Sequence, residues 1–418
     1  MSDPMSDILP DATSPERFSA FEAPFLRAPE GARTVFLVTA GACAGPLAAG
    51  AMLFGWRALA VTALSVLSCA AIEKAYYRVT RAPALLGRSH ACLTGLLLAM
   101  TLPAFVPWYV PIIAAAFAIL VGKAVFGGVG HFLWQPALVG RLAVAVLFPA
   151  TVMNPSAWPL LAQNKAIFGD VAQAKRSAVY RQWQGTPAPQ GADAFALPHP
   201  TAELSSLTRG AEPAYSGLIF PGDWPRAKPT ALAALPPIGE MLYGARPGGI
   251  GETCIILILV AGLYLVYRNY VKWQLPLAML AGAWAVAAVA PIRLAGPNNT
   301  IETVWWPLLG HHLAGRCDAD LCVQVGFTYV NYQLLGGELF LAAFFLAPEM
   351  TTRPVTTGGQ VLFALGCGVL GMLLQLYFET PIPFYLAVLA MNTAVPTIDA
   401  LWRPRVLGAR RFAFLRRA

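Results

Sequence analysis

Ten apolar segments, arranged in two groups of five, limit how this chain can fold. The first group lies within residues 34–153 and the second within residues 249–402, with a polar stretch at residues 154–248 between them. Only 12% of the 418 residues are charged, against about 25% in an ordinary soluble domain. The sequence therefore predicts an all-α polytopic membrane protein with about ten transmembrane helices. The expected segments are Thr34–Trp56, Ala58–Ala71, Ala91–Pro103, Val110–Val121, Ala137–Met153, Ile250–Tyr267, Leu275–Ile292, Val330–Leu346, Val361–Phe378 and Ile382–Leu401.

Several of these segments are shorter than the roughly 20 residues that a straight spanning helix needs, so we expect helices that stop or break inside the bilayer. The two halves also resemble each other. Ala91–Pro103 (ACLTGLLLAMTLP) and Gly336–Pro348 (GGELFLAAFFLAP) are both apolar runs that end in proline. This likeness predicts a five-plus-five internal repeat.

The stretch Phe126–Arg141, FGGVGHFLWQPALVGR, interrupts the apolar pattern with Gly127, Gly128 and Gly130 and then with Gln135-Pro136. Glycine permits close approach of a ligand or of backbone, and proline leaves a carbonyl that another group must satisfy. A similar break occurs at Met391–Asp399, MNTAVPTID. Matching interruptions in two halves predict a binding site at the repeat interface. Close packing of ordinary helices through small residues is the alternative.

Lysine and arginine indicate the orientation, because they gather in cytoplasmic loops. If both termini are cytoplasmic, the short loops on the other side hold only Arg57, Arg293 and Arg316, and the cytoplasmic loops include Lys123 and Arg141. We therefore predict a cytoplasmic tail at 1–33, a basic cytoplasmic tail at 403–418 and an extracytoplasmic loop at 154–248. This pattern accounts for the net charge of +8 without a nucleic-acid partner.

Charged side chains at membrane depth often mark ion pathways. Glu338 follows Gly336-Gly337 at the start of a segment, and Asp399 ends the last one. Both are candidates for an ion pathway, with helix capping or an interfacial position as the alternative. Arg141, just after the glycine break, either faces an anionic ligand or anchors the chain at the surface.

A second outside loop is expected at residues 293–328. It contains His311, His312, Cys317 and Cys322 in GHHLAGRCDADLC. Neither the adjacent histidines nor the spacing of the cysteines matches a common zinc site, so no metal site is predicted. A local disulfide is favoured on the outside of the cell, with free thiols or a bound metal as alternatives.

Four stretches resemble the NqrB/RnfD family, the membrane subunits of sodium-pumping NADH:quinone reductase and of the Rnf complex. They are FGGVGHFLWQPALVGRL (Phe126–Leu142), GETCIILILVAGLYLVYR (Gly251–Arg268), LLGGELFLAAFF (Leu334–Phe345) and LAMNTAVPTIDALWRPRVLG (Leu389–Gly408). The resemblance covers most of Ala91–Arg410. It implies two inverted five-helix repeats with broken helices, in a bacterial inner membrane.

The resemblance also implies a covalent FMN, attached through its phosphate to a threonine of the long outside loop. Laid on the family's pattern, residues 227–232 put the attachment on Thr230. A second, non-covalent flavin would lie near the glycine-broken helix, beside Gly127, Gly128, Gln135 and Asn392. The implied partners are the other membrane and peripheral subunits of an Rnf/Nqr-type complex, a flavin transferase and the lipid bilayer.

The function implied is a flavin-carrying subunit that passes electrons across the bilayer, coupled to Na⁺ or H⁺ movement. The chain has no NAD fingerprint or iron–sulfur cysteine set, so it would be one part of an oxidoreductase complex. One alternative is a transporter or channel-like protein that kept the inverted-repeat fold and lost the redox role. Its motivation is Ala227-Lys228-Pro229 before Thr230, where the family has Ser/Thr-Gly-Ala. An assembly scaffold for a neighbouring oxidoreductase is a further alternative.

Overall fold

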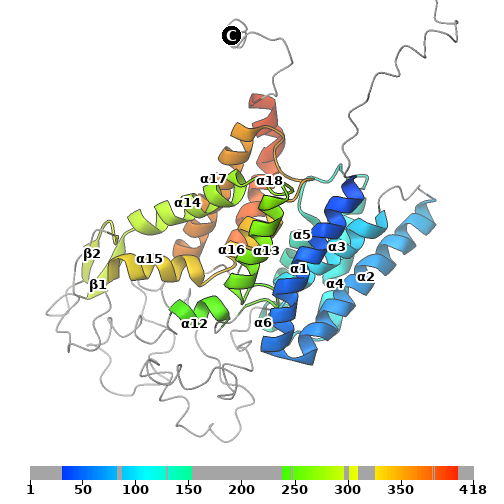
Figure 1. Ribbon diagram of the computed structural model, residues 1–418, viewed down its shortest axis with the longest axis horizontal. Coiled ribbons are helices and arrows are strands. Elements are labelled where there is room, and N and C mark those ends of the chain that lie inside the picture. Colours follow the sequence, from blue (N-terminus) through cyan, green and yellow to red (C-terminus); the bar gives the residue numbers. More distant parts are fainter. Residues whose placement is uncertain are drawn as a thin grey trace, which may run out of the picture.

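A computed structural model of the chain describes residues 31–81, 87–128, 130–152, 238–244, 246, 248–295, 301–308, 325–378, 380 and 382–402. Most of these residues are helical (Figure 1). The helices of the first half are α1 (Ala32–Phe54), α2 (Trp56–Thr80), α3 (Gly87–Thr101), α4 (Tyr109–Ala116) with its π-helical continuation η3 (Phe117–Ala124), α5 (Pro136–Leu147) and α6 (Pro149–Val152). Those of the second half are α12 (Ile238–Tyr243), α13 (Ile255–Tyr267), α14 (Gln274–Val289), α15 (Val325–Leu335), α16 (Leu339–Leu341) with its π-helical continuation η7 (Ala342–Leu346), α17 (Thr357–Tyr377) and α18 (Pro383–Leu401).

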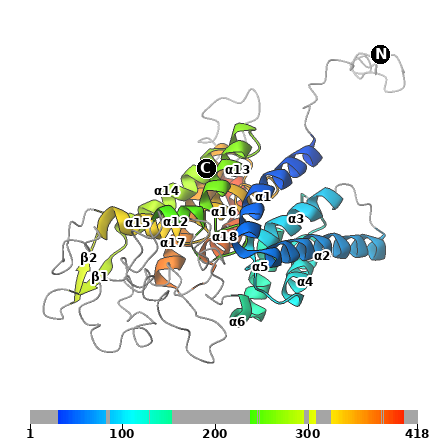
Figure 2. The same ribbon diagram turned by 60° about the horizontal axis from the view of Figure 1, so that its bottom comes forward.

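The two halves of the chain lie side by side (Figures 1 and 2). Helix α1 packs against α13, and α5 packs against α18, so the contact between the halves involves the start and end of each apolar group. Within the part of the chain that the structure describes, four helices are long and apolar enough to cross a membrane: α1, α2, α17 and α18. Shorter apolar helices within α3, α4–η3, α5, α13 and α14 complete the described set. A set of apolar helices of these lengths is typical of a polytopic membrane protein.

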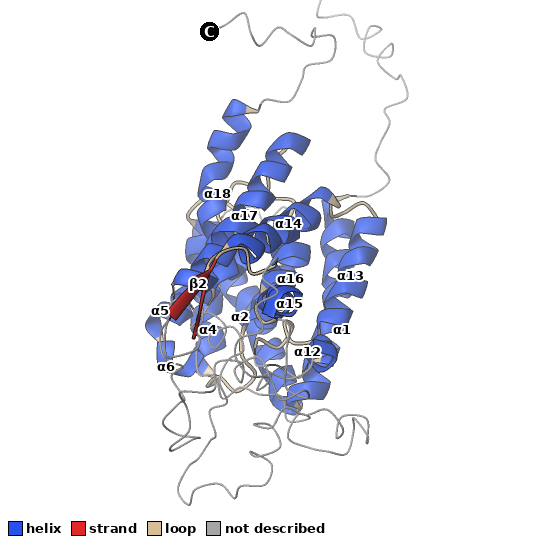
Figure 3. Cartoon of the chain, turned by 90° about the vertical axis from the view of Figure 1, so that its left-hand side faces the viewer, coloured by secondary structure: helices blue, strands red, loops and turns tan. Residues whose placement is uncertain are grey.

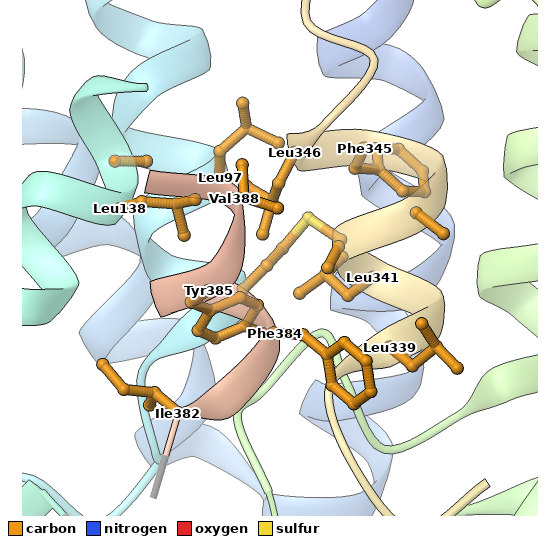
Figure 4. Close-up of a cluster of buried hydrophobic side chains, with 14 of the residues drawn as sticks. Leu97, Leu138, Leu339, Leu341, Phe345, Leu346, Ile382, Phe384, Tyr385 and Val388 are labelled. Carbon is orange, nitrogen blue, oxygen red and sulfur yellow. The ribbon is translucent and has the colours of Figure 1, made fainter. Parts of the chain in front are cut away.

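Buried apolar side chains from both halves form a common core (Figure 4). Leu97 of α3 and Leu138 of α5 meet Leu341, Leu346 and Val388 of the second half. All five side chains are buried. The α5 and α18 helices that carry part of this core both begin with proline at a first-turn position, where the missing N–H costs no helical hydrogen bond.

Glycines allow several helices to pack at backbone distance. A Cβ atom on Gly140 of α5 would lie 2.4 Å from the backbone oxygen of Ala114 in α4. Similarly, a Cβ atom on Gly368 of α17 would lie 2.1 Å from the backbone oxygen of Met279 in α14. Contacts through small residues of this kind are typical of helices in membranes.

We expect Gly140→Ala to lower the free energy of unfolding by about 1–3 kcal/mol, because α5 must move away from α4 to admit the methyl group. Gly41→Ala on α1 is the matched control, since nothing lies within 4 Å of its Cβ position. The control should gain up to about 1 kcal/mol from its higher helix propensity. Thermal midpoints of the purified chain in detergent compare the two variants, and equal midpoints would contradict the prediction.

The described residues depart from an all-helical chain at one place. Strands β1 (Ile292–Ala295) and β2 (Ile301–Val304) form an antiparallel hairpin at the edge of the second half (Figure 3). The hairpin lies where the sequence predicts the start of the second outside loop. The expected segment Val330–Leu346 is also interrupted, because α15 ends at Leu335 and α16 begins at Leu339.

Several sequence-based predictions fall outside the described residues. They concern Thr230, most of residues 154–248, His311, His312, Cys317, Cys322 and the two tails. The described cysteines, Cys43, Cys69, Cys92, Cys254 and Cys367, are free thiols within or beside apolar helices.

Candidate functional site

Five buried polar side chains meet where the two halves of the chain join. They are Arg141, Arg246, Glu252, Glu338 and Tyr385, called the junction cluster below, and each is at most 7% exposed. The residues come from α5, the segment between α12 and α13, the α15–α16 break and α18. Electrostatic interactions join Arg141 to the Glu252, Glu338 and Tyr385 side chains. Burying charged groups is costly, so a cluster of this size indicates a function or a tightly paired structural role.

The segment Gly248–Thr253 positions Glu252 in the cluster. Its backbone is bonded to the end of α3, since Ile250 N–H donates to Leu102 O at 2.9 Å and Gly251 N–H donates to Met100 O at 2.9 Å. A Cβ atom on Gly249 would lie 2.6 Å from the Met100 oxygen, so only glycine fits there. Glu252 then accepts hydrogen bonds from Gly249 N–H, at 2.7 Å, and from the Tyr385 hydroxyl.

Arg246 connects this segment to the break between α15 and α16. Its guanidinium donates to the backbone oxygens of Glu252, Thr253, Leu335 and Gly337, with distances of 3.2 Å to Thr253 and 2.8 Å to Gly337. A helix that ends inside a protein leaves carbonyl groups without partners. The five N–H donors of arginine suit this arrangement, so Arg246 stabilises a break that would otherwise leave buried carbonyl groups without partners.

Some buried polar atoms near the junction cluster have no hydrogen-bond partner among the described residues. They are Nε and Nη1 of Arg141, Oε2 of Glu338 and both side-chain polar atoms of Asn392. Asn392 lies two turns after Tyr385 on the same face of α18 and is 0% exposed. An unsatisfied buried polar group costs about 1–3 kcal/mol. These atoms are therefore candidates for contact with a bound group.

The comparison with known proteins assigns the chain to a family. The model of the NQR2, RnfD, RnfE family matches residues 20–408. The chain belongs to this family. The resemblance inferred from the four sequence stretches is thus confirmed, and the match also includes the long polar loop.

Individual relatives in the family are named as subunits of related complexes. A subunit of an "Ion-translocating oxidoreductase complex" from Halorhodospira halophila is 31% identical over 390 residues, which are 93% of this chain and 95% of the relative. A subunit of a "Proton-translocating ferredoxin:NAD(+) oxidoreductase complex" from Clostridium ljungdahlii is 28% identical over 94% of this chain and 97% of the relative. A subunit of a "Na(+)-translocating ferredoxin:NAD(+) oxidoreductase complex" from Acetobacterium woodii is 25% identical over 92% and 94%. The family thus includes proteins from complexes named for different ions.

Of the four residues predicted to lie beside a non-covalent flavin, three have a structural role in the backbone or at a helix start, and one does not. Gly127 and Gly128 have φ angles of 97° and 101°, which favour glycine, in the turn after η3. Gln135 is buried at the start of α5, where its Oε1 accepts a hydrogen bond from Leu138 N–H at 2.8 Å. Gln135 therefore caps the helix. Asn392 is different, because its side chain is buried on α18 with no structural partner among the described residues.

The two predicted ion-pathway residues lie at opposite ends of α18. The Glu338 carboxylate interacts with the backbone of Phe384 at the start of the helix. Asp399 lies near its end and accepts a hydrogen bond from Val355 N–H at 3.1 Å. Phe384 and Asp399 are fifteen residue steps of helix apart, about 22 Å. Through this hydrogen bond, Asp399 fixes the segment before α17 to the end of α18. Glu338, in contrast, belongs to the junction cluster.

Sequence reasoning assigned no role to Arg246, Glu252 or Tyr385. It counted Lys123 as a cytoplasmic-loop charge and left Arg141 either facing an anionic ligand or anchored at the surface. Lys123 is 2% exposed and Arg141 is 5% exposed. The sequence feature that could have indicated these buried residues is a single charged residue beside or within an apolar run, as in GARPGGIGETCII for Arg246 and Glu252. Identifying their partners required the packing of segments distant in the sequence.

Proposed function

We propose that this chain is the RnfD-type, flavin-carrying membrane subunit of an ion-translocating oxidoreductase complex. The observation that carries the proposal is the junction cluster together with Asn392, because they place incompletely paired charged and amide groups between the two halves of a membrane protein of this family. The names of the relatives support the coupling of electron transfer to Na⁺ or H⁺ movement. The other subunits of an Rnf/Nqr-type complex and a flavin transferase are the proposed partners.

The architecture proposed is ten membrane-crossing segments in two inverted five-helix repeats. Two parallels between the halves support it. Each half contains a π-helical segment next to a chain break, η3 before the glycine turn and η7 after the α15–α16 break. Each half also ends in a packed pair, α4–η3 with α5 and α17 with α18. The distribution of Lys and Arg supports cytoplasmic termini in a bacterial inner membrane.

FMN is proposed as a phosphoester on Thr230, with a second flavin bound without a covalent bond. The unpartnered donor and acceptor of Asn392 suit the mixed donor and acceptor edge of a flavin ring, and the free N–H groups of Arg141 suit its carbonyl oxygens. Gly127 and Gly128 would allow close approach, with Gln135 fixing the start of α5 beside them. A bound flavin supplies one- and two-electron transfer. The chain's own residues hold and orient the ring and exclude water.

Thr230→Val should abolish covalent flavin, because valine has no hydroxyl to form the phosphoester. Thr208→Val, in the same loop, is the matched control and should retain the flavin. Ultraviolet fluorescence of the denatured chain on a gel, followed by peptide mass measurement over Pro221–Leu235, tests both variants. An unmodified wild-type peptide from cells that flavinylate other proteins would refute the covalent carrier. Solute flux into vesicles without redox partners would then favour the transporter-like alternative.

Asn392→Leu should reduce acid-released, non-covalent flavin while leaving the fold intact. Since both polar atoms of Asn392 are buried without partners, their replacement by an apolar group of similar size should raise the stability of the flavin-free chain by about 1 kcal/mol. Thr393→Val, on the exposed side of α18, is the control. Unchanged flavin content in Asn392→Leu would exclude this residue from the site.

A further inference from the structure

Two buried pairs of ionisable side chains lie outside the junction cluster. Lys123 of η3 donates a hydrogen bond to Oε1 of Glu73 in α2 at 2.7 Å. Nε2 of His90 in α3 lies 3.2 Å from Oε1 of Glu349, which follows η7. The four side chains are at most 6% exposed. We call them the lysine–histidine cluster.

The two pairs form one electrostatic unit with contributions from both halves of the chain. Glu349 interacts electrostatically with Lys123 as well as pairing with His90. The His90 ring is held by the rings of Phe36 and Phe132, with centroids at 5.0 and 5.4 Å, and its Nδ1 lies 3.3 Å from Thr94 Oγ1.

Each carboxylate of the cluster retains spare hydrogen-bonding capacity. Oε2 of Glu73 and Oε2 of Glu349 have no hydrogen-bond partner among the described residues. The other titratable groups near the cluster, among the residues that the structure describes, are Cys69 and Tyr77 on α2, Cys92 on α3, and Tyr270 after α13.

Glu349 lines a small cavity. Its volume is about 30 Å³, and it lies between α1, α3, the end of α13 and η7. Apart from Glu349, Thr39 and Tyr270, its lining is apolar, with Phe36, Leu93 and Phe344 among the lining residues. A single water needs roughly 10–15 Å³ of such space, so the cavity has room for one or two water molecules.

The lysine–histidine cluster and the junction cluster lie at the two ends of one helix. Glu338 precedes α16 and Glu349 follows η7, and the eleven residue steps from one to the other span about 16 Å. The buried apolar side chains of Figure 4, including Leu341, Leu346 and Leu97, lie around this helix. A π-helical turn inside a helix often marks a functional position. Two clusters of ionisable side chains separated by an apolar layer are the arrangement expected for an ion pathway in which passage from one cluster to the other is controlled.

The composition of the lysine–histidine cluster favours a proton over a metal cation. Alkali cations prefer several oxygen ligands, whereas this cluster presents an ammonium group and an imidazole beside its two carboxylates. The Lys123 charge repels a metal cation. Among the described residues, no group of three or more His, Cys, Asp or Glu side chains is placed to hold a metal ion.

We propose that Glu73, His90, Lys123 and Glu349 form a proton-loading site that exchanges protons through the cavity beside Glu349. The inference rests on the proposed function, since it names the ion and an entry point for the coupled movement. In loading, a hydronium ion in the cavity transfers its proton to the free Oε2 of Glu349 and becomes water. Release is the reverse reaction, and no electron moves within the cluster.

The test uses the complete complex, isolated through this chain and reconstituted in vesicles with a pH-sensitive dye. We expect the double variant Glu349→Gln with His90→Gln to lose proton uptake per electron transferred, and Glu349→Asp to restore part of it. The control is Gln333→Leu with Gln375→Leu, a buried hydrogen-bonded pair at 2.7 Å that has no titrating group. The control should keep the wild-type proton uptake per electron.

A pH-dependent infrared difference spectrum of the wild type and of Glu349→Gln gives a second readout that needs no turnover. The carboxylic-acid band should disappear in Glu349→Gln and shift in Glu349→Asp, which a purely structural residue would not cause. Wild-type proton uptake in the double variant, a Na⁺-only wild type or an unchanged band would overturn the proton-loading site. A wild-type complex without flavin or electron transfer would instead refute the proposed function.

Discussion

Arg246→Met is expected to prevent stable folding of the chain. The substitution removes the donor to four backbone oxygens, those of Glu252, Thr253, Leu335 and Gly337, and leaves the buried Glu252 with less positive charge near it. Unsatisfied buried polar groups cost about 1–3 kcal/mol each and an unpaired buried charge about 3–5 kcal/mol. The combined loss, about 7 kcal/mol or more, is comparable to the roughly 5–15 kcal/mol by which a typical folded protein is more stable than its unfolded state.

Arg246→Lys should rescue little of this loss, because one ammonium group cannot reproduce the planar fork of the guanidinium. Arg57→Met is the matched control: Arg57 is exposed, stacks over the Phe105 ring at 5.6 Å, and should lose less than about 1 kcal/mol. Fluorescence-detected size-exclusion profiles of detergent extracts measure the folded fraction. A normal profile for Arg246→Met would show that the α15–α16 break does not depend on this side chain.

Single substitutions in the Glu73–Lys123 pair should destabilise the chain strongly, whereas the double substitution should not. Glu73→Gln leaves a buried ammonium group and Lys123→Met leaves a buried carboxylate, so each single variant should lose about 3–5 kcal/mol. Glu73→Gln with Lys123→Met removes both charges while roughly keeping the volume. Replacement of a whole buried pair is often neutral or stabilising.

The thermal midpoints of the wild type and the three variants give the coupling between the two side chains directly. If the double variant is as unstable as either single variant, packing and not charge determines the loss of stability. The thermal midpoint of the wild type should change little with salt concentration, because salt screens a buried ion pair much less than an exposed one.

The order and approximate bounds of the apolar helices could be predicted because burial in lipid requires apolar side chains along a helix. Gln135-Pro136 also predicted a boundary, and α5 begins there with a capping side chain and a proline. The hairpin Ile292–Val304 was missed, because two four-residue strands leave little periodicity. Its only signal is the turn-forming run Gly296-Pro297-Asn298-Asn299 between them.

The candidate site was predictable only in part. Glu338 and Asn392 were identified from their positions in apolar or broken segments, and both side chains are buried. Lys123 was read as a loop charge, because a cation at the end of an apolar run has the same local sequence whether it faces lipid headgroups or a buried Glu73. That distinction depends on a contact across fifty residues of chain.

The π-helical segment η7 determines how the two ends of its helix are turned relative to each other. A π turn holds one residue more than an α turn, and each residue of an α-helix rotates the side-chain direction by about 100°. Without the extra residue, the backbone after Leu346 would be rotated by about that angle relative to Glu338. The backbone register of Ala342–Leu346 therefore decides whether Glu349 faces His90, and removing one residue there would separate the pair without changing any charge.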